Sequence, residues 1–389
     1  MSKEVKIGID VTRANREYRG IPIYTRSILR EFGQVDPEKV KFVLTKYRDD
    51  KNTSNYGIKN ADIERVPFNG RYVPWLRILQ EQVVYPFFQK GIDLDVFWHP
   101  QNHGQYLTPV GYVCTLHDVL PLSKPTLSQD LDSLDTVALY QSRIKSARHA
   151  TKIITVSHFS KDEICHYVGV PQNRVVVVHN GIDHSVFHDG ISRETMNKVR
   201  AKYHLPQRYL LTVGSYAPHK NLSTLVEAFS RSHLVDQNYG LVMVGPKDDS
   251  VYTSDAQKLE RLVGELGLSN QVLMLPAVPI DDLVGIYNGA SIFAISSLCE
   301  GFGFPPLEAM ACGVPVIASN TTSLPEICGN SVLYADPKDS QTFTDQINLL
   351  AKDDFLRSKL VTQAKNHVRQ FTWEKTAQQT LDVLIESSK

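Results

Sequence analysis

Short, almost continuously apolar runs recur along the chain and alternate with amphipathic segments. Such runs are typical of strands buried on both faces of a parallel sheet, and the segments between them are typical of crossover helices. In the first half, strands are predicted at residues 6–11, 41–44, 95–98, 112–116, 152–156 and 174–178. After a polar stretch that ends near residue 207, they are predicted at residues 209–213, 240–244, 272–275, 291–295 and 314–318. The pattern predicts two successive α/β domains.

The two predicted domains meet near residue 185, after the turn-forming pair Asn180-Gly181. In the second domain, Leu222, Leu225, Val226 and Phe229 keep the spacing of a helix that buries one face. Ligands of parallel α/β sheets bind outside the carboxyl ends of the strands. We therefore expect the chemistry in a cleft between the strand ends of the two domains.

Composition narrows the class of protein. The 389 residues carry 42 basic and 42 acidic side chains, so the chain lacks the basic surplus of a general nucleic-acid binder. Its five cysteines form no C-x-x-C pair, which implies free thiols in a reducing compartment and no zinc site. The charged N-terminus and the lack of a long apolar run predict a cytoplasmic protein, with peripheral contact to a membrane left open.

Charge is unevenly distributed although it sums to zero. Residues 1–180 carry 24 Lys and Arg against 19 Asp and Glu, so the first half is positive and the second half negative. This asymmetry is either ordinary solvated surface or a sign that the first half meets an anionic partner.

Residues 291–313 read S-I-F-A-I-S-S-L-C-E-G-F-G-F-P-P-L-E-A-M-A-C-G, a buried strand followed by a glycine loop and a helix. Pro306 fits the first helical position and Gly313 fits a helix stop. This places Glu300 in the loop and Glu308 in the first turn of the helix. Loop glycines let backbone N–H groups approach a ligand, and a helix N-terminus favours a phosphate. An early Glu can also simply complement the helix dipole.

Glu300 and Glu308, with seven residues between them, resemble the E-x7-E signature of retaining glycosyltransferase family 4. Further motifs follow the order of that family along nearly the whole chain. They are T-L-H-D at 115–118, I-T-V-S-H-F-S at 154–160, V-H-N-G-I-D at 178–183, V-G-S-Y-A-P-H-K-N at 213–221 and F-T-W-E-K-T-A at 371–377.

The resemblance implies the GT-B fold, an α/β architecture of two Rossmann-like, doubly wound domains that face each other across a cleft. It makes residues 1–184 the acceptor-side domain and residues 185–370 the domain that binds the nucleotide sugar. Residues 371–389 would form a helix that crosses back to the first domain.

The resemblance also implies roles for the residues of the E-x7-E segment. Glu308 would bind the ribose hydroxyls of the donor, and Glu300 would lie beside the transferred sugar as a catalytic residue. The loop and helix start would complete the donor site with Gly301, Phe302, Gly303 and Leu307.

Residues 213–221 follow the first strand of the second domain, a position suited to a diphosphate. We expect Gly214, Ser215, His219 and Lys220 to bind the donor there, with Lys220 offering a compact positive charge to the phosphate oxygens. The family often has Arg where Ser215 and His219 stand. Either the diphosphate charge is less fully neutralised here, or His219 contributes when protonated.

Two positions of the first domain complete the expected site. His117 ends the predicted strand 112–116, and the resemblance places its imidazole against the donor sugar, with Asp118 fixing its tautomer or capping the turn. Gly20 matches a family loop near the N-terminus, where Pro22 replaces a later glycine. Because Pro is favoured at the first helical position, this loop would shape a substrate more than bind phosphate.

We therefore expect a metal-independent, retaining glycosyltransferase without cofactors, which moves a hexose from a nucleotide diphosphate donor to a glycan or lipid-linked hydroxyl. The resemblance implies front-face attack, with the leaving phosphate accepting the proton of the acceptor hydroxyl, and the residues by themselves leave double displacement open as well. Other GT-B activities, such as a nucleotide-sugar epimerase or a phosphorylase, are alternatives. A catalytically silent scaffold is another, and donor binding would argue against it.

The stretch W-L-R-I-L-Q-E-Q-V-V-Y-P at 75–86 and D-V-F-W-H-P at 95–100 look most like the mannosyl- and rhamnosyl-transferring branch of surface-polysaccharide synthesis. GDP-mannose is accordingly the first expectation for the donor.

Overall fold

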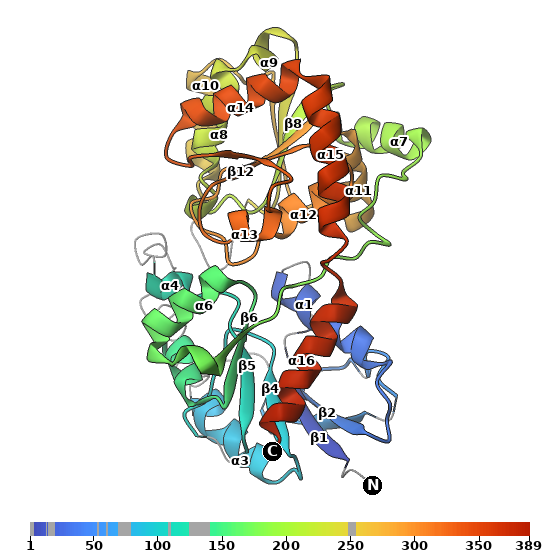
Figure 1. The fold of residues 1–389 in the computed structure, drawn as a ribbon, viewed down its shortest axis with the longest axis vertical. Helices are drawn as coiled ribbons and strands as arrows, with labels where there is room; N and C mark the ends of the chain where they lie inside the picture. The colour runs from blue at the N-terminus through green and yellow to red at the C-terminus, as the bar shows by residue number, and fades with distance from the viewer. Residues whose placement is uncertain are drawn as a thin grey trace. The chain divides into compact units, whose positions relative to one another are not determined.

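The chain forms two compact units in a computed structural model (Figure 1). The structure describes residues 4–12, 14, 20–52, 54–59, 61–68, 79–107, 110–123, 141–247 and 254–389. Residues 75–78 of the branch motif therefore lie outside the described part. The first unit consists of Met1–Gly181 and Phe371–Lys389, and the second of Ile182–Gln370. The division falls three residues before the boundary that the sequence suggested.

The first unit is built on a parallel sheet, seven-stranded in the described part of the chain, with strand order β3-β2-β1-β4-β5-β6-β7. The strands are β1 (Val5–Asp10), β2 (Val40–Lys46), β3 (Asp62–Arg65), β4 (Val96–His99), β5 (Tyr112–Thr115), β6 (Lys152–Thr155) and β7 (Val175–Val177). Each neighbouring pair runs parallel, so the carboxyl ends of the strands share one edge.

Helical segments connect and flank the strands of the first sheet. They are α1 (Gly20–Phe32), η1 (Gln80–Val84), α3 (Tyr85–Lys90), α4 (Leu120–Ser123), η3 (Ala147–His149), α6 (His158–Ile164), η4 (Cys165–Gly169), η5 (Gln172–Arg174) and α16 (Trp373–Ser387). In α1, Tyr24, Ile28 and Leu29 are fully buried. Burying each such side chain contributes roughly 1.5–3 kcal/mol.

The C-terminal helix α16 belongs to the first unit. It packs on α1 and on strands β4, β5 and β6, as its red ribbon shows beside the blue α1 in Figure 1. Thr372 caps its first turn by accepting a hydrogen bond from the N–H of Lys375. The ring of Trp373 meets that of Tyr24 at a centroid distance of 6.2 Å. The end of the chain thereby supports the helix that opens the first unit.

The second unit repeats this architecture on a parallel sheet with strand order β10-β9-β8-β11-β12-β13, six strands within the described residues. The strands are β8 (Tyr209–Val213), β9 (Gly240–Val244), β10 (Val272–Leu275), β11 (Ile292–Ile295), β12 (Val316–Ser319) and β13 (Leu333–Ala335). The helices are α7 (Arg193–Tyr203), η6 (Pro218–Lys220), α8 (Leu222–Arg231), α9 (His233–Asp236), α10 (Ala256–Glu265), α11 (Ile280–Gly289), α12 (Phe304–Ala311), α13 (Leu324–Cys328), α14 (Ser340–Lys352) and α15 (Asp354–Val368).

The helical spacing predicted in the second unit is confirmed in α8. Leu222, Leu225, Val226 and Phe229 are all buried, and they join the core beneath the sheet. At the carboxyl edge, β8 and β9 approach so closely that a Cβ at Gly245 would collide with the carbonyl oxygen of Gly214. These two glycines let the loops after both strands turn side by side.

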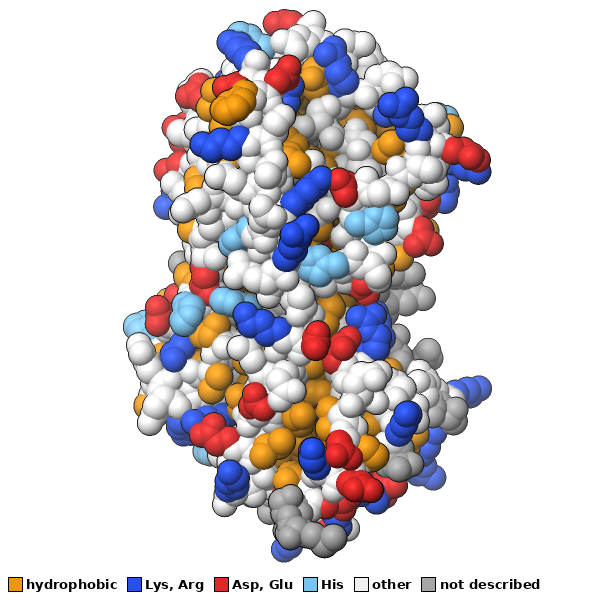
Figure 2. Space-filling view, turned by 45° about the vertical axis from the view of Figure 1, so that its right-hand side comes forward, with side chains coloured by type: hydrophobic (Ala, Val, Ile, Leu, Met, Phe, Trp, Pro, Cys, Tyr) orange, Lys and Arg blue, Asp and Glu red, His pale blue; other side chains and the backbone are white. Residues whose placement is uncertain are grey.

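None of the helices in the described ranges has the length and apolar character needed to cross a bilayer. On the face drawn in Figure 2, Lys and Arg side chains are interspersed with Asp and Glu over both units. The excess of basic residues in the first half therefore does not gather into one continuous positive field on that face.

Candidate active site

The loop and helix that carry the E-x7-E segment differ in one respect from the sequence prediction. Strand β11 ends at Ile295, and α12 begins at Phe304, two residues before Pro306. Gly303 stands at the N-cap with a left-handed φ of 106°, which lets the chain enter the helix early. The expectation that Pro306 occupies the first helical position, and that Glu308 lies in the first turn, is therefore wrong. Glu308 lies in the second turn, where it complements the helix dipole only weakly.

Glu300 lies among hydrogen-bond donors. Its Oε1 accepts from Lys220 Nζ at 2.7 Å and from Ser297 Oγ at 2.6 Å. Its backbone N–H donates to Thr322 Oγ1 at 3.1 Å, and its carbonyl accepts from Ser323 Oγ at 2.9 Å. The loop is thereby fixed at both the side chain and the main chain.

The charge of Glu300 is set by two opposing effects. Burial is the largest single effect and favours the neutral acid, but the positive charge of Lys220, the electrostatic effect of His219 and the hydrogen bonds from Lys220 and Ser297 together outweigh it. The net result is a pKa below the ordinary value of the carboxyl, so Glu300 is ionised at neutral pH.

Lys220 comes from the turn η6 between β8 and α8. The following residue, Asn221, has a left-handed φ of 53° and donates from Nδ2 to the carbonyl of Ser296 at 3.1 Å. The stem of Lys220 lies over Gly214, where an added Cβ would sit 3.6 Å from Cε. The structure thus brings together the predicted catalytic residue Glu300 and two of the predicted donor-binding residues, Gly214 and Lys220.

His219 is buried, and burial lowers the pKa of its imidazole to about 4, helped by the positive charge of Lys220. The ring is neutral at physiological pH. The alternative in which protonated His219 neutralises phosphate concerns the donor-bound protein and stays a prediction. Ser215 follows Gly214 and is half-buried.

Glu308 has an environment unlike that of Glu300. Its Oε2 accepts a hydrogen bond of 2.8 Å from the hydroxyl of Tyr287 on α11. Burial raises the pKa of Glu308 to about 7, because the bond from Tyr287 opposes the effect of burial only in part. Leu307, beside it on α12, is fully buried and anchors the helix in the core.

The remaining residues predicted around the loop are Gly301, Phe302 and Gly303. The carbonyl of Phe302 accepts from Ser323 Oγ at 3.0 Å, and the side chain of Phe302 is buried. Gly301 is half-buried and continues the chain from Glu300. Sequence reasoning missed Ser297, Tyr287 and Ser323 as supporting residues. The Ser296-Ser297 pair directly after a buried strand was the available signal for the first of them.

In the first unit, His117 lies two residues beyond the end of β5. Its backbone N–H donates to Asn102 Oδ1 at 2.6 Å, and its Nε2 lies 3.2 Å from the carbonyl oxygen of Pro100. Because a carbonyl can only accept, Nε2 carries the proton and Nδ1 keeps its lone pair. The ring of Tyr24 contacts the imidazole edge-on, with the two ring centroids 4.6 Å apart. Burial lowers the pKa of His117 to about 4, so the ring is neutral.

Asp118 and Gly20 are the other two residues of the first unit that the sequence analysis singled out. Asp118 Oδ1 accepts from the N–H of Leu120 at 3.1 Å, which is the turn-capping alternative. Gly20 is the exposed first residue of α1. Pro22 is the third residue of that helix, so its placement at the first position is wrong. Its missing N–H is still costless there, because the first turn has no helical acceptor for it.

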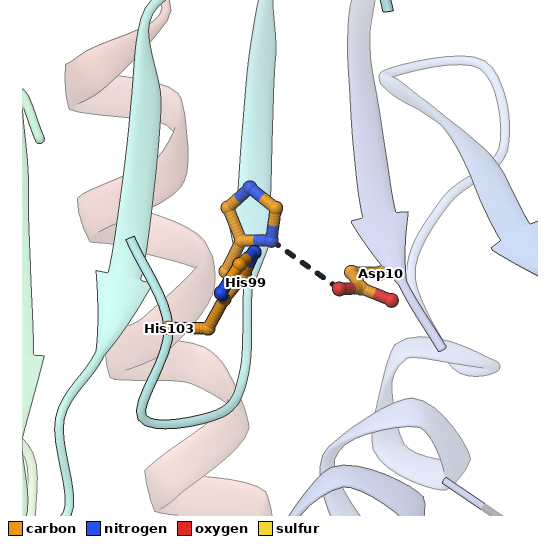
Figure 3. A group of neighbouring side chains, drawn as sticks. All are labelled: Asp10, His99 and His103. Carbon is orange, nitrogen blue, oxygen red and sulfur yellow. Dashed lines mark hydrogen bonds and ion pairs between the residues drawn. The ribbon is translucent and has the colours of Figure 1, made fainter. Parts of the chain in front are cut away.

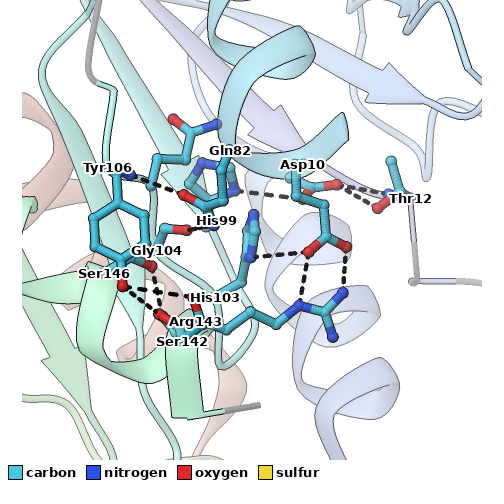
Figure 4. A network of polar contacts seen from close by, with 12 residues as sticks. Asp10, Thr12, Gln82, His99, His103, Gly104, Tyr106, Ser142, Arg143 and Ser146 are labelled. Atoms are coloured by element: carbon cyan, nitrogen blue, oxygen red, sulfur yellow. Dashed lines mark hydrogen bonds and ion pairs between the residues drawn. The ribbon is translucent and has the colours of Figure 1, made fainter. Parts of the chain in front are cut away.

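A polar cluster at the carboxyl edge of the first sheet was missed by the sequence analysis. Asp10 ends β1, His99 ends the neighbouring β4, and His103 follows in the next loop (Figure 3). Arg143 lies close by (Figure 4). It forms a bidentate pair with Glu81, in which Nε of Arg143 donates to Glu81 Oε2 at 2.7 Å. Polar residues that end adjacent buried strands were the signal for this cluster.

Comparison with protein families agrees with this geometry. The model of the glycosyl transferases group 1 matches residues 195–367, and that of Glycosyltransferase Family 4 matches residues 20–186. O-antigen chain mannosyltransferase B of Escherichia coli is 32% identical over 278 residues, covering 69% of this chain and 69% of that protein. The chain belongs to glycosyltransferase family 4.

Two further relatives of this family 4 chain bear on its extent and fold. The serotype-specific mannosyltransferase WbdA of Escherichia coli is 29% identical over 71% of this chain, but the match covers only 34% of WbdA. Anabaena HepE, solved in complex with UDP-glucose, superposes with a TM-score of 0.71 at 18% identity, over 98% of this chain and 100% of that one. The expected GT-B fold, two Rossmann-like domains with parallel sheets, is confirmed.

Proposed function

We propose that the chain is a hexosyltransferase that moves mannose from GDP-mannose to a glycan or lipid-linked hydroxyl during synthesis of a surface polysaccharide. The observation that carries the proposal is the Lys220–Glu300 pair at the carboxyl edge of the second sheet, in a family 4 chain. The mannosyltransferase names of O-antigen chain mannosyltransferase B and WbdA support mannose as the sugar.

The chemical problem is departure of a diphosphate from the anomeric carbon. Negative charge develops on the leaving oxygen while positive charge develops on the sugar. Lys220 Nζ and the backbone N–H groups at the start of α12 stabilise the leaving group. The carboxylate of Glu300 faces the sugar and stabilises the positive centre. Substrate binding thus draws Lys220 toward phosphate and leaves Glu300 for the sugar.

Glu308 binds the ribose hydroxyls of the donor in this proposal. A carboxylate accepts two hydrogen bonds from adjacent hydroxyls, and donor binding therefore favours its ionised form. His117, with its neutral ring and free Nδ1 lone pair, is proposed to contact the transferred sugar. Gly20 is proposed to shape the substrate-binding surface at the start of α1.

Retention is proposed from the resemblance to retaining family 4 enzymes. No metal ion is needed at the diphosphate in this proposal, because Lys220 and the helix N-terminus supply the charge that a divalent cation supplies elsewhere. The acceptor hydroxyl attacks the face from which the diphosphate departs, and the departing phosphate oxygen takes the hydroxyl proton. One glycosidic bond forms as one sugar–phosphate bond breaks.

A panel of nucleotide sugars tests the proposal. The purified chain is incubated with GDP-mannose, GDP-fucose, UDP-glucose, UDP-galactose and dTDP-rhamnose, and release of the nucleotide diphosphate is measured. We expect hydrolysis of GDP-mannose to exceed that of the other donors, and Lys220→Ala to weaken donor binding and slow this hydrolysis. If only a UDP or dTDP sugar were hydrolysed, that sugar nucleotide would take the place of GDP-mannose as the proposed donor. Absence of both turnover and nucleotide binding would favour the silent scaffold.

For the acceptor, we propose a lipid-linked phosphate at an anionic membrane surface, on the basis of the basic excess in residues 1–180. Sedimentation with anionic and neutral liposomes at low and high salt tests this. Binding to anionic liposomes that weakens with salt supports it. Equal binding to both kinds of liposome, or none, returns the charge asymmetry to ordinary solvated surface.

A further inference from the structure

The cluster at the carboxyl edge of the first sheet brings three metal-binding side chain types together. One ligand atom from each of Asp10, His99 and His103 lies within 4.8 Å of the other two, and all three residues are buried. They come from the ends of two neighbouring strands and the loop that follows (Figure 3). Their positions are therefore set by the sheet itself rather than by surface side-chain rotamers.

The closest approach within the cluster has the spacing of two ligands of one ion. Nδ1 of His99 lies 3.3 Å from Oδ2 of Asp10. A charge-assisted N–H···O bond is usually shorter, about 2.7–2.9 Å. Two ligand atoms that each lie about 2.0–2.2 Å from a zinc ion at tetrahedral angles are separated by roughly 3.3–3.5 Å. The observed distance fits the second arrangement better.

Three buried nitrogen atoms in and beside the cluster lack a hydrogen-bond partner among the described residues. Within the described part of the chain, no residue forms a hydrogen bond with Nε2 of His99, Nδ1 of His103 or Nε2 of Gln101. Leaving a buried polar atom unsatisfied is costly. Nδ1 of His103 can bind a cation through its lone pair, whereas the amide nitrogen of Gln101 can only donate a hydrogen bond. The nearest carboxylate oxygen to His103 Nδ1 is Glu81 Oε2, at 3.8 Å, beyond hydrogen-bond distance.

A small cavity adjoins the cluster. Asp10, Gln101, His103 and Glu81 line it together with Thr12 and three aromatic side chains. The cavity has room for at least one water molecule or one small ion.

Charge at the site favours a cation. Arg143 neutralises Glu81 through its bidentate pair, so the carboxylate of Asp10 remains as the net charge beside the two imidazoles (Figure 4). The loop that carries His103 is held in place independently of any ion. Nε2 of Gln82 donates to the carbonyl of Gly104 at 2.9 Å, and a Cβ on Gly104 would collide with the backbone of Ala147. The ligands are thus prearranged.

We infer that Asp10, His99 and His103 bind one divalent transition-metal ion of the Zn²⁺ class, with a water in the adjoining cavity as a further ligand. Two imidazoles and a carboxylate suit Zn²⁺ or Co²⁺, whereas Mg²⁺ and Ca²⁺ prefer all-oxygen sites. The ion ties the loop after β4 to the end of β1. It lies in the first unit and is separate from the diphosphate chemistry proposed for the second, so it goes beyond the proposed function.

Metal analysis of the full chain tests the site. The protein is stripped with a chelator, titrated with Zn²⁺ or Co²⁺, passed over a desalting column and analysed for metal and for visible absorption. We expect one equivalent of Zn²⁺ to be retained and to raise the melting temperature. Co²⁺ should give the intense visible bands of a low-coordinate nitrogen and oxygen site. Retention of no ion, or a Co²⁺ spectrum like that of the hydrated ion, would overturn the inference.

Variants locate the ion. His103→Gln and Asp10→Asn should each weaken Zn²⁺ affinity by about 100-fold or more, because each removes a ligand and loss of a ligand's outer-shell support alone costs about 10- to 100-fold. His233→Gln, an exposed histidine on α9, is the matched control and should retain the full equivalent. Equal Zn²⁺ affinity in all three variants would place the ion elsewhere. Should a variant fail to fold, the Co²⁺ spectrum of the wild type decides alone.

Discussion

Two stretches of one segment, the loop after β11 and the second turn of α12, hold carboxylates in opposite states. Glu300 in the loop accepts from Lys220 and Ser297, and its pKa is lowered. Glu308 in the helix has the hydroxyl of Tyr287 as its charge-neutral partner, and burial raises its pKa to about 7. Sequence spacing alone makes the two residues look like a matched pair. Their surroundings give them different chemistry.

The difference teaches how one motif can supply two functions. A carboxylate kept ionised by a lysine can stabilise developing positive charge without first losing a proton. A carboxyl group whose pKa is near 7 is readily converted to the carboxylate when hydroxyl groups of a bound ligand donate hydrogen bonds to it. We therefore propose that Glu300 mainly determines the rate of transfer and that Glu308 mainly determines the affinity for the donor.

The largest effect is expected from Glu300→Gln. The variant removes the negative charge whose attraction to the positively charged sugar becomes stronger in the transition state. We therefore expect kcat to fall by about 10²-fold, which corresponds to about 2.7 kcal/mol of lost transition-state stabilisation. Donor KM should change less. Steady-state kinetics with donor varied at saturating acceptor measure both. A variant that raised KM alone would move Glu300 into the role assigned to Glu308.

Lys220→Ala should come next. Loss of a charge-assisted contact with the diphosphate is worth ~1.5–3 kcal/mol, or roughly 10- to 150-fold in nucleotide affinity measured by calorimetry. The variant also leaves Glu300 buried without its cation, so the melting temperature should fall. The double variant with Glu300→Gln should recover part of that loss. Unchanged affinities for GDP, UDP and dTDP would exclude Lys220 from the donor site.

Glu308→Gln should act mainly on donor binding. Gln keeps one acceptor oxygen but cannot take a charge, so donor KM should rise by about tenfold at pH 8 and by less at pH 6, where Glu308 is largely protonated. The comparison of wild type with variant at each pH removes the titration of the phosphate itself. An effect that did not depend on pH would contradict the raised pKa.

The same residue should affect stability in the donor-free protein. Because the folded pKa lies near 7 and the unfolded one near 4.5, the folded state holds the extra proton between these values. Stability contributed by this group is present below about pH 4.5 and is lost as pH rises through 7, by up to about 3 kcal/mol. Glu308→Gln lacks this loss. Its melting temperature relative to wild type should therefore be higher at pH 8 than at pH 5.

The smallest effect is expected from removing Mg²⁺ and Mn²⁺. Nucleotide affinity and turnover should be unchanged within error, because Lys220 supplies the charge at the diphosphate. One equivalent of Zn²⁺ is supplied in both arms, so that the cluster of the first unit does not affect the comparison. Activity that depends on added Mn²⁺ or Mg²⁺ would contradict metal-independent transfer.

The buried strands could be predicted because their apolar runs are nearly continuous. Strand β3, with the sequence D-I-E-R, escaped because three of its four side chains are exposed at the sheet edge. Strand β13 has only three residues, and α7 lies in a stretch that looked merely polar. In each case tertiary context, rather than a local pattern, decides the structure.

The identities of the site residues could be predicted from the sequence motif. Their protonation states could not, because these are set by packing. Lys220, Glu300 and Glu308 could be singled out from the sequence. The protonation of Glu308 and the neutrality of His219 could not, because both depend on burial by distant segments such as α11. The cluster of Asp10, His99 and His103 escaped because its members are 89 residues apart or lie in a loop, and only sheet order makes them neighbours.

The most direct test of the contrast is a titration of the two carboxyl groups. Protein labelled with ¹³C at the glutamate carboxyl is followed by NMR from pH 3 to pH 9, and resonances are assigned by their absence in Glu300→Gln and Glu308→Gln. We predict that the Glu308 resonance titrates near pH 7 and that the Glu300 resonance titrates below the ordinary glutamate range. Two resonances that titrate together near pH 4.5, or in the reverse order, would contradict the account.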